Sequence, residues 1–182
     1  MSQTKLREAV LSDLAPYSSN AAPGWRSVVT RCIASPGYFG CVLLRLQQAL
    51  LSAGHKRIAA ILRSVTYFVV GIDGCPQAPI GPGLFVPHPA GLVLGPGVVI
   101  GANVTLCQHV TLGALHLPDR GTPTFPIVED GAFVGAGACA LGDVRIGAYA
   151  TVGANSVVVS DIPAGMTYVG VPAHPLREAS GK

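Results

Sequence analysis

His88 is the residue in this sequence best placed to do acid–base chemistry. It lies between Pro87 and Pro89, so the backbone on both sides has little conformational freedom. Histidine titrates close to neutral pH, and a histidine held in one position is suited to act as a general base. Asp73, fifteen residues earlier, would fix the imidazole tautomer if the fold brought the two together. The alternative is that Pro-His-Pro forms only a stiff surface corner.

The other histidines give a weaker pattern. His109 and His116, together with His88, are candidates for a zinc site, but they form no compact ligand motif. Tetrahedral zinc needs three or four converging donors, so we expect no metal site. The sequence also lacks a G-x-x-x-x-G-K phosphate loop and a G-x-S-x-G nucleophile elbow.

The element that must position His88 is a six-residue repeat. Helices repeat every 3.6 residues and strands every two, so a period of six indicates a β-helix, in which each unit forms one face of a coil. Three faces make one turn, which would place Asp73 about one coil below His88. The repeated aliphatic positions are Leu94, Ile100, Leu106, Leu112, Val128, Val134, Ala140, Ile146, Val152 and Val158. The small or branched residues four places on are Val98, Val104, Val110, Ala132, Ala138, Val144, Ala150 and Ser156.

The repeat is interrupted twice. Val86 and the next inward position, Leu94, are eight residues apart instead of six, so the register slips around His88. A second break follows Leu112, because the next inward position comes sixteen residues later. Residues 114–125 must therefore leave the coil as a loop, and loops on a rigid scaffold commonly carry function.

The residues before the repeat are expected to be helical. Apolar side chains at helical spacing predict one helix that ends at Pro16 and another over about residues 39–52. A third has an apolar stripe, which we interpret as core or subunit contacts, made of Ile58, Ile61, Leu62, Val65 and Phe68. We therefore expect a helical region over 1–70, a β-helix over 71–165 with the loop 114–125, and a tail over 166–182. Two prolines make that tail incompatible with further regular coils.

The composition narrows the class of protein. Hydrophobic residues make up 49% of the 182 residues and charged residues 12%, so we expect outer faces of the coil to be buried between subunits. A net charge of +3 without a basic block argues against nucleic-acid binding. Five scattered cysteines indicate a reducing, cytoplasmic setting. The amino terminus does not read as a signal peptide, and no apolar run is long enough to span a membrane.

Residues from Gly71 to Arg177 resemble the catalytic half of bacterial serine acetyltransferases and related hexapeptide O-acetyltransferases. Residues 36–39 (Pro-Gly-Tyr-Phe) also resemble part of that family's amino-terminal region, which is typically longer. The matching pieces are Gly-Ile-Asp (71–73), Ile-Gly-Pro-Gly (80–83), Ala-Gly-Leu-Val-Leu-Gly (90–95), Gln-His-Val-Thr-Leu-Gly (108–113), Val-Gly-Ala-Gly-Ala (134–138), Val-Gly-Ala-Asn-Ser-Val-Val (152–158) and Gly-Val-Pro-Ala (170–173).

The resemblance implies a left-handed parallel β-helix assembled as a homotrimer, with acetyl-CoA between neighbouring coils. Whether trimers pair through the helical region stays open. His88 matches the family's general base and Asp73 its partner. The positions that border the pantetheine arm in the family are Gly113, Ala114, Ala136 and Ala154.

The sequence departs from the family where the acceptor binds. Pro87 stands where the serine enzymes have an aspartate, and Thr124 and Phe125 replace part of a charged run. Arg120 is either solvated or contacts an anionic acceptor or the cofactor phosphates. We expect Pro87, Arg120 and Phe125 to border the acceptor, and we expect that acceptor to be a sugar hydroxyl in exopolysaccharide or surface-glycan synthesis. The alternatives are serine O-acetylation and a non-catalytic trimeric scaffold.

Overall fold

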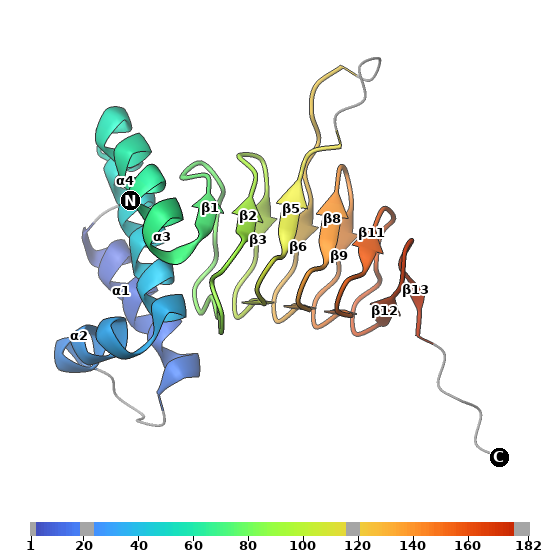
Figure 1. The fold of residues 1–182 in the computed structure, drawn as a ribbon, viewed down its shortest axis with the longest axis horizontal. Helices are drawn as coiled ribbons and strands as arrows, with labels where there is room; N and C mark the ends of the chain where they lie inside the picture. The colour runs from blue at the N-terminus through green and yellow to red at the C-terminus, as the bar shows by residue number, and fades with distance from the viewer. Residues whose placement is uncertain (1–2, 19–23, 116–120, 177–182) are drawn as a thin grey trace.

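The computed structural model describes residues 3–18, 24–115 and 121–176. A helical part, blue to green in Figure 1, covers one end of a β-helix that runs from green to red. Within the described residues the helices are α1 (Gln3–Leu14), α2 (Trp25–Ala34), α3 (Pro36–Ser52) and α4 (Lys56–Val70), with a 3-10 turn, η1 (Ala15–Tyr17), after α1.

Local sequence signals account for several of these helix boundaries. Ser35 precedes α3 and its Oγ accepts a hydrogen bond from the Tyr38 N–H at 3.3 Å, while Pro36 occupies the first helical turn. Gly71 ends α4 with φ +74°, a left-handed conformation that glycine adopts without the usual steric cost. Helix α2 was not predicted as a separate helix, although Trp25, Val28, Val29, Cys32 and Ile33 have helical spacing; of these only Val28 is buried.

The predicted stripe on α4 does not pack into the core as a whole. Leu62 packs against the main cluster of buried residues, but the other members of the stripe face outward. The exposed ones are Ile58, Ile61, Val65 and Phe68. The reading of this stripe as plain core is therefore wrong for those four residues, and its reading as a subunit contact stays a prediction.

The rest of the described chain forms three short-stranded sheets, one on each face of the coil. The first sheet holds β1 (Ile72–Gly74), β2 (Leu92–Leu94), β5 (Thr111–Gly113), β8 (Cys139–Leu141) and β11 (Val157–Val158). The second holds β4 (Thr105–Leu106), β7 (Phe133–Val134), β10 (Thr151–Val152), β12 (Thr167–Val169) and β13 (His174–Pro175), and the third holds β3 (Val99–Ile100), β6 (Ile127–Val128) and β9 (Arg145–Ile146). Within the described residues, the strands pair in parallel except for β12 with β13, which is antiparallel.

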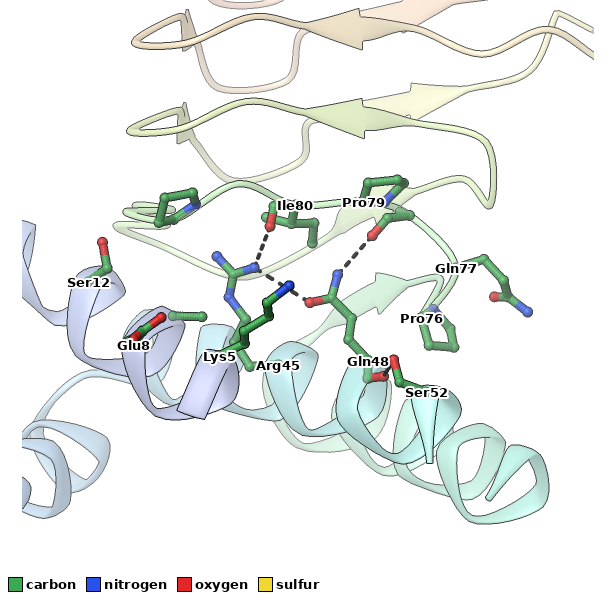
Figure 2. Close-up of a pocket in the computed structure, with 13 residues that line it drawn as sticks. Lys5, Glu8, Ser12, Arg45, Gln48, Ser52, Pro76, Gln77, Pro79 and Ile80 are labelled. Carbon is green, nitrogen blue, oxygen red and sulfur yellow. Dashed lines mark hydrogen bonds between the residues drawn. The ribbon is translucent and has the colours of Figure 1, made fainter. Parts of the chain in front are cut away.

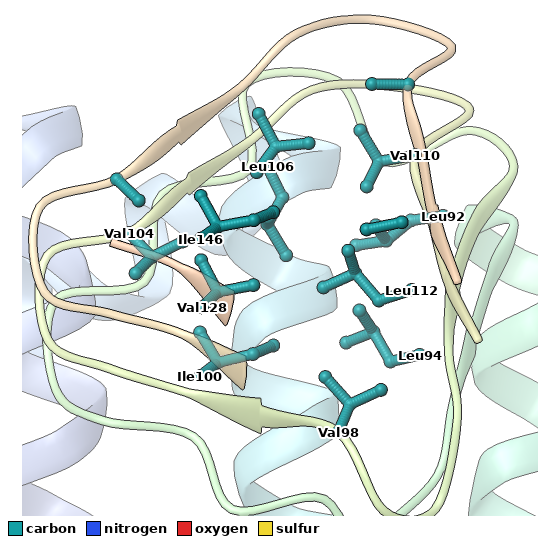
Figure 3. Packing of buried hydrophobic residues seen from close by; sticks show 14 of the residues in the cluster. Leu92, Leu94, Val98, Ile100, Val104, Leu106, Val110, Leu112, Val128 and Ile146 are labelled. Atoms are coloured by element: carbon teal, nitrogen blue, oxygen red, sulfur yellow. The ribbon is translucent and has the colours of Figure 1, made fainter. Parts of the chain in front are cut away.

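The six-residue repeat forms the core of this coil. Every predicted inward position from Leu94 to Val158 is buried, and so is every predicted position four places on. Figure 3 shows several of these side chains stacked inside the coil, among them Leu94, Leu112 and Ile146. A buried aliphatic side chain stabilises the folded state by about 1.5–3 kcal/mol, so the ladder is a major source of stability.

The predicted register slip is confirmed by the strand pairing. Phe85 pairs with Thr105 and Val93 pairs with Thr111, so eight residues (85 to 93) lie opposite six (105 to 111). The two extra residues fall in the segment that contains His88. At the other end, β12 pairs with β10 beyond residue 165, so the coil continues further than the sequence predicted.

Candidate active site

Helical residues hold the backbone that leads into His88. The Tyr17 hydroxyl donates a hydrogen bond to the Val86 carbonyl at 2.7 Å and accepts one from the Val86 N–H at 2.9 Å. Burial raises the pKa of Tyr17, so the phenol stays protonated and can make both bonds. Gly37 at the start of α3 packs so closely on the Val86 carbonyl that a Cβ there would collide with it. Pro87, half-buried, and His88, exposed, follow this clamped residue.

A buried ion pair fixes the helical part to the coil. Arg45 of α3 donates to both carboxylate oxygens of Asp13 at 2.8 and 2.9 Å, and to the carbonyls of Ile80 and Gly81 at 2.7 and 2.6 Å. Asp13 also accepts a hydrogen bond from the Leu84 N–H at 2.9 Å. Figure 2 shows Arg45 and Gln48 reaching from α3 to the first coil, at the edge of a cavity of about 730 Å³. The segment before His88 is therefore tied to the helices at several points.

Asp73 lies on β1 and is held by a residue that sequence reasoning missed. Its Oδ1 accepts a hydrogen bond from Arg63 Nε at 2.8 Å, and a terminal guanidinium nitrogen of Arg63 lies 2.6 Å from the same oxygen. Both side chains are partly exposed, at 40% for Arg63 and 38% for Asp73. No hydrogen bond joins Asp73 to His88, although both belong to the described part of the chain. The predicted dyad is thus not formed in this structure.

One edge of the coil brings predicted residues into line. Residues with positive φ stack there in successive coils: Gly71, Gly91, His109, Gly137 and Asn155. The backbone N–H groups of the upper four donate to the coil below, on Gly71, Ala90, Gln108 and Ala136, at 2.8–2.9 Å. We call this stack the Gly71–Asn155 edge. Ala136 and Ala154 directly precede two of its members, so two of the four predicted cofactor residues lie at this edge. His88 comes three residues before Gly91 in the sequence.

The other two predicted cofactor residues lie elsewhere. Gly113 is the last residue of β5, so it lies at the opposite end of that strand from the Gly71–Asn155 edge. Its carbonyl accepts a hydrogen bond from the Gly142 N–H at 3.0 Å. Ala114 follows Gly113 and is partly exposed.

The loop after Gly113 is anchored at its return. The ring of Phe125 lies over Gly95 and Gly97, where side chains would collide with it, and it packs against the main core. Phe125 therefore has a packing role, and its predicted contact with an acceptor stays a prediction. Arg120 and His116 lie outside the described residues. Among the described residues no three His, Cys, Asp or Glu side chains gather as metal ligands.

Within the described ranges, no single helix is both long and apolar enough to cross a membrane, and only the bent pair α2–α3, at 119°, meets the length and composition criteria jointly.

The three-faced coil built on a six-residue repeat defines the fold class as a left-handed parallel β-helix. Residues 125–160 match the family model described as bacterial transferase hexapeptide (six repeats). The serine acetyltransferase of Helicobacter pylori is 40% identical over 147 residues, which are 76% of this chain and 80% of that protein. The chain belongs to the serine acetyltransferase family.

Solved structures agree with this assignment. The serine acetyltransferase of Neisseria gonorrhoeae superposes with a TM-score of 0.85 at 34% identity, covering 100% of this chain and 70% of that one. Its complex with serine gives a TM-score of 0.83 at 35% identity, with 96% and 70% covered. The chain spans 58% of the length of a matching Buchnera aphidicola enzyme and 55% of one from Staphylococcus xylosus, so it is shorter than several relatives.

Proposed function

We propose that this chain transfers an acetyl group from acetyl-CoA to the hydroxyl of L-serine. The observation that carries the proposal is the similarity to serine acetyltransferases over nearly the whole chain, including a structure solved with serine and one solved with CoA. The expected sugar acceptor and a role in polysaccharide synthesis have no support among these relatives. Serine, which the sequence analysis gave as an alternative acceptor, therefore replaces the sugar hydroxyl as the acceptor that we propose.

In the proposed reaction His88 is the general base. Its imidazole takes the proton from the acceptor hydroxyl as the oxygen attacks the thioester carbonyl carbon. The carbon–sulfur bond then breaks, and the departing thiolate takes the proton from the imidazolium. General-base catalysis of this kind contributes roughly 10²–10⁴-fold to the rate. Backbone N–H groups would stabilise the negative oxygen, and holding both reactants together supplies proximity.

Asp73 would orient the His88 imidazole during this step. A carboxylate has two oxygens, and Arg63 occupies only Oδ1, which leaves Oδ2 to accept from the imidazole N–H. Catalysis by the pair therefore requires His88 to turn toward Asp73 when the substrates bind. Hydrogen bonds in active sites commonly tighten in this way on substrate binding.

Acetyl-CoA would lie between two chains of a homotrimer. The separation of Gly113 and Ala114 from Ala136 and Ala154 supports this arrangement, since one chain presents them on different parts of its surface. Exposed apolar side chains on the coil, such as Val99 and Phe133, add apolar area for subunit contacts. Small residues at the four positions would let the pantetheine arm approach the backbone.

The test is CoA thiol release in the presence of candidate acceptors. Saturable turnover with L-serine and none with simple glycosides supports the proposal, whereas the reverse preference restores the sugar hydroxyl. The sequence feature that favours a sugar acceptor is the presence of Thr124 and Phe125 where the serine enzymes have part of a charged run. Calorimetric titration with CoA distinguishes either acetyltransferase activity from the third hypothesis, a non-catalytic scaffold. Absence of CoA binding at millimolar concentration would contradict acetyl transfer to either acceptor.

A further inference from the structure

Arg63 stands on a helix that is fixed at two places. Helix α4 packs on α3, where Gln47 Nε2 donates a hydrogen bond to Thr66 Oγ1 at 2.7 Å between two buried side chains. At the carboxyl end of α4, the Gly71 carbonyl accepts a hydrogen bond from the Gly91 N–H at 2.9 Å. The backbone that carries Arg63 is therefore held against both the helical part and the coil.

The hydrogen bond between Gly71 and Gly91 also brings the segment of Asp73 against the segment of His88. Gly71 lies two residues before Asp73, and Gly91 lies three residues after His88. A Cβ added to Gly71 would lie only 3.2 Å from the Ala90 Cα, so the two backbones are in close contact. The carboxylate and the proposed base thus belong to contacting segments of adjacent coils.

Arg63 is the side chain that restrains the Asp73 carboxylate. Its Nε and one terminal nitrogen both lie on Oδ1, at 2.8 and 2.6 Å. Among the residues that the structure describes, no other side chain hydrogen-bonds this carboxylate. A cavity of about 500 Å³ beside it leaves room for other rotamers of Asp73. Because both donors are directed to one oxygen, Oδ2 stays available to a further donor.

We propose that Arg63 is a positioning residue, which holds the Asp73 carboxylate so that Oδ2 can accept the imidazole N–H of His88. This inference rests on the part of the proposed function that makes His88 the base and Asp73 its partner. Arg63 touches neither reactant and acts only through Asp73. Groups that fix the partner of an active residue in this way contribute to the rate through geometry.

The positive charge of Arg63 and its positioning role would change the rate in opposite directions. When His88 takes a proton it becomes an imidazolium, which a nearby cation disfavours. Removing that cation without any loss of orientation would therefore raise kcat. Loss of orientation lowers kcat, since a displacement of about 1 Å can reduce a rate roughly 100-fold. The direction of the change in kcat thus separates the two effects.

The experiment is a double-mutant cycle on Arg63 and Asp73. The variants Arg63→Gln, Asp73→Ala and their combination are compared with wild type for kcat and for the KM of L-serine and of acetyl-CoA. We expect Arg63→Gln to lower kcat roughly tenfold, with both KM values within about twofold of wild type. In the Asp73→Ala background the same substitution should lower kcat by less than about twofold, because the group that Arg63 positions is already absent.

Two controls accompany the cycle. Arg57→Gln removes an exposed arginine from the same helix and should leave all three kinetic parameters within about twofold of wild type. The melting temperature of Arg63→Gln should stay within about 2 °C of wild type, because a partly exposed ion pair adds little stability.

An unchanged or raised kcat in Arg63→Gln overturns the proposal. Equal fold-losses from Arg63→Gln in the wild-type and Asp73→Ala backgrounds also overturn it, since Arg63 would then act independently of Asp73. Wild-type kcat in Asp73→Ala contradicts the proposed pairing with His88 and, with it, this role of Arg63. Wild-type protein that releases CoA with a glycoside and not with L-serine contradicts the proposed acceptor, a distinct result, and the same cycle is then measured with that glycoside.

Discussion

The hydroxyl of Tyr17 holds both backbone groups of Val86, accepting from its N–H at 2.9 Å and donating to its carbonyl at 2.7 Å. This contact joins residues 69 positions apart and fixes the chain two residues before His88. The amino-terminal helical part is thus a structural support for the proposed base as well as a cover for the first coil.

Tyr17→Phe should therefore impair catalysis as well as stability. The variant leaves the two polar groups of Val86 without this partner in a partly buried place, which costs about 1–3 kcal/mol. Small displacements of a base lower the rate strongly, so we expect kcat to fall roughly tenfold. Thermal unfolding and steady-state kinetics measure the two effects. Tyr149→Phe, at a side chain that is 74% exposed, is the control and should change neither.

The Arg45–Asp13 pair should behave as a buried ion pair. Arg45→Met leaves the Asp13 carboxylate buried without its cation, and we expect a loss of about 3–5 kcal/mol in the free energy of unfolding at pH 7. The matched control is Arg145→Met, which breaks an exposed pair with Glu129 and should cost about 0–1 kcal/mol. Denaturant titrations of both variants provide the comparison, and equal losses would contradict the account.

The cost of Arg45→Met should also depend on pH. Burial already raises the pKa of Asp13, while Arg45 opposes that rise, so the variant's Asp13 pKa will be higher still. A carboxyl with a raised folded-state pKa destabilises the protein above its unfolded-state pKa and ceases to do so once the pH falls toward that value. The difference from wild type should therefore shrink as the pH is lowered from 7 toward 4. A difference that grows over this range would contradict the assignment.

Gly91 tests the packing of the Gly71–Asn155 edge. It has φ +71°, and a Cβ there would collide with the His109 imidazole. Gly165 has the same φ but nothing within 4 Å of an added Cβ, so Gly165→Ala isolates the conformational cost of about 1–2 kcal/mol. We expect Gly91→Ala to be the more destabilising in thermal unfolding and to reduce activity, because Ala90 and His88 lie just before it. Equal effects of the two substitutions would show that the contact is unimportant.

The coil was predictable because its repeat is a one-dimensional pattern. Inward side chains such as Leu112 and Ile146 recur at one position of each repeat and share one core, so sequence spacing determines their burial. The slip at His88 was visible for the same reason, as a departure from that spacing.

The contacts that surround the site were not predictable in this way. Arg63 meets Asp73, and Tyr17 meets Val86, because a helix packs on the first coil in one orientation, which no local pattern specifies. Helix α2 shows the same limit, since it carries apolar residues at helical spacing and yet only Val28 on it is buried. Such tertiary contacts depend on how the elements are arranged, and the spacing of residues within each element says nothing about that arrangement.

We propose His88 as the base in acetyl transfer to L-serine. The direct test is the rate of CoA release by His88→Ala protein with saturating acetyl-CoA and L-serine, beside wild type and the exposed control His55→Ala. We predict a fall of about 100-fold or more for His88→Ala and less than a twofold change for His55→Ala. Release by His88→Ala at the wild-type rate would contradict the account.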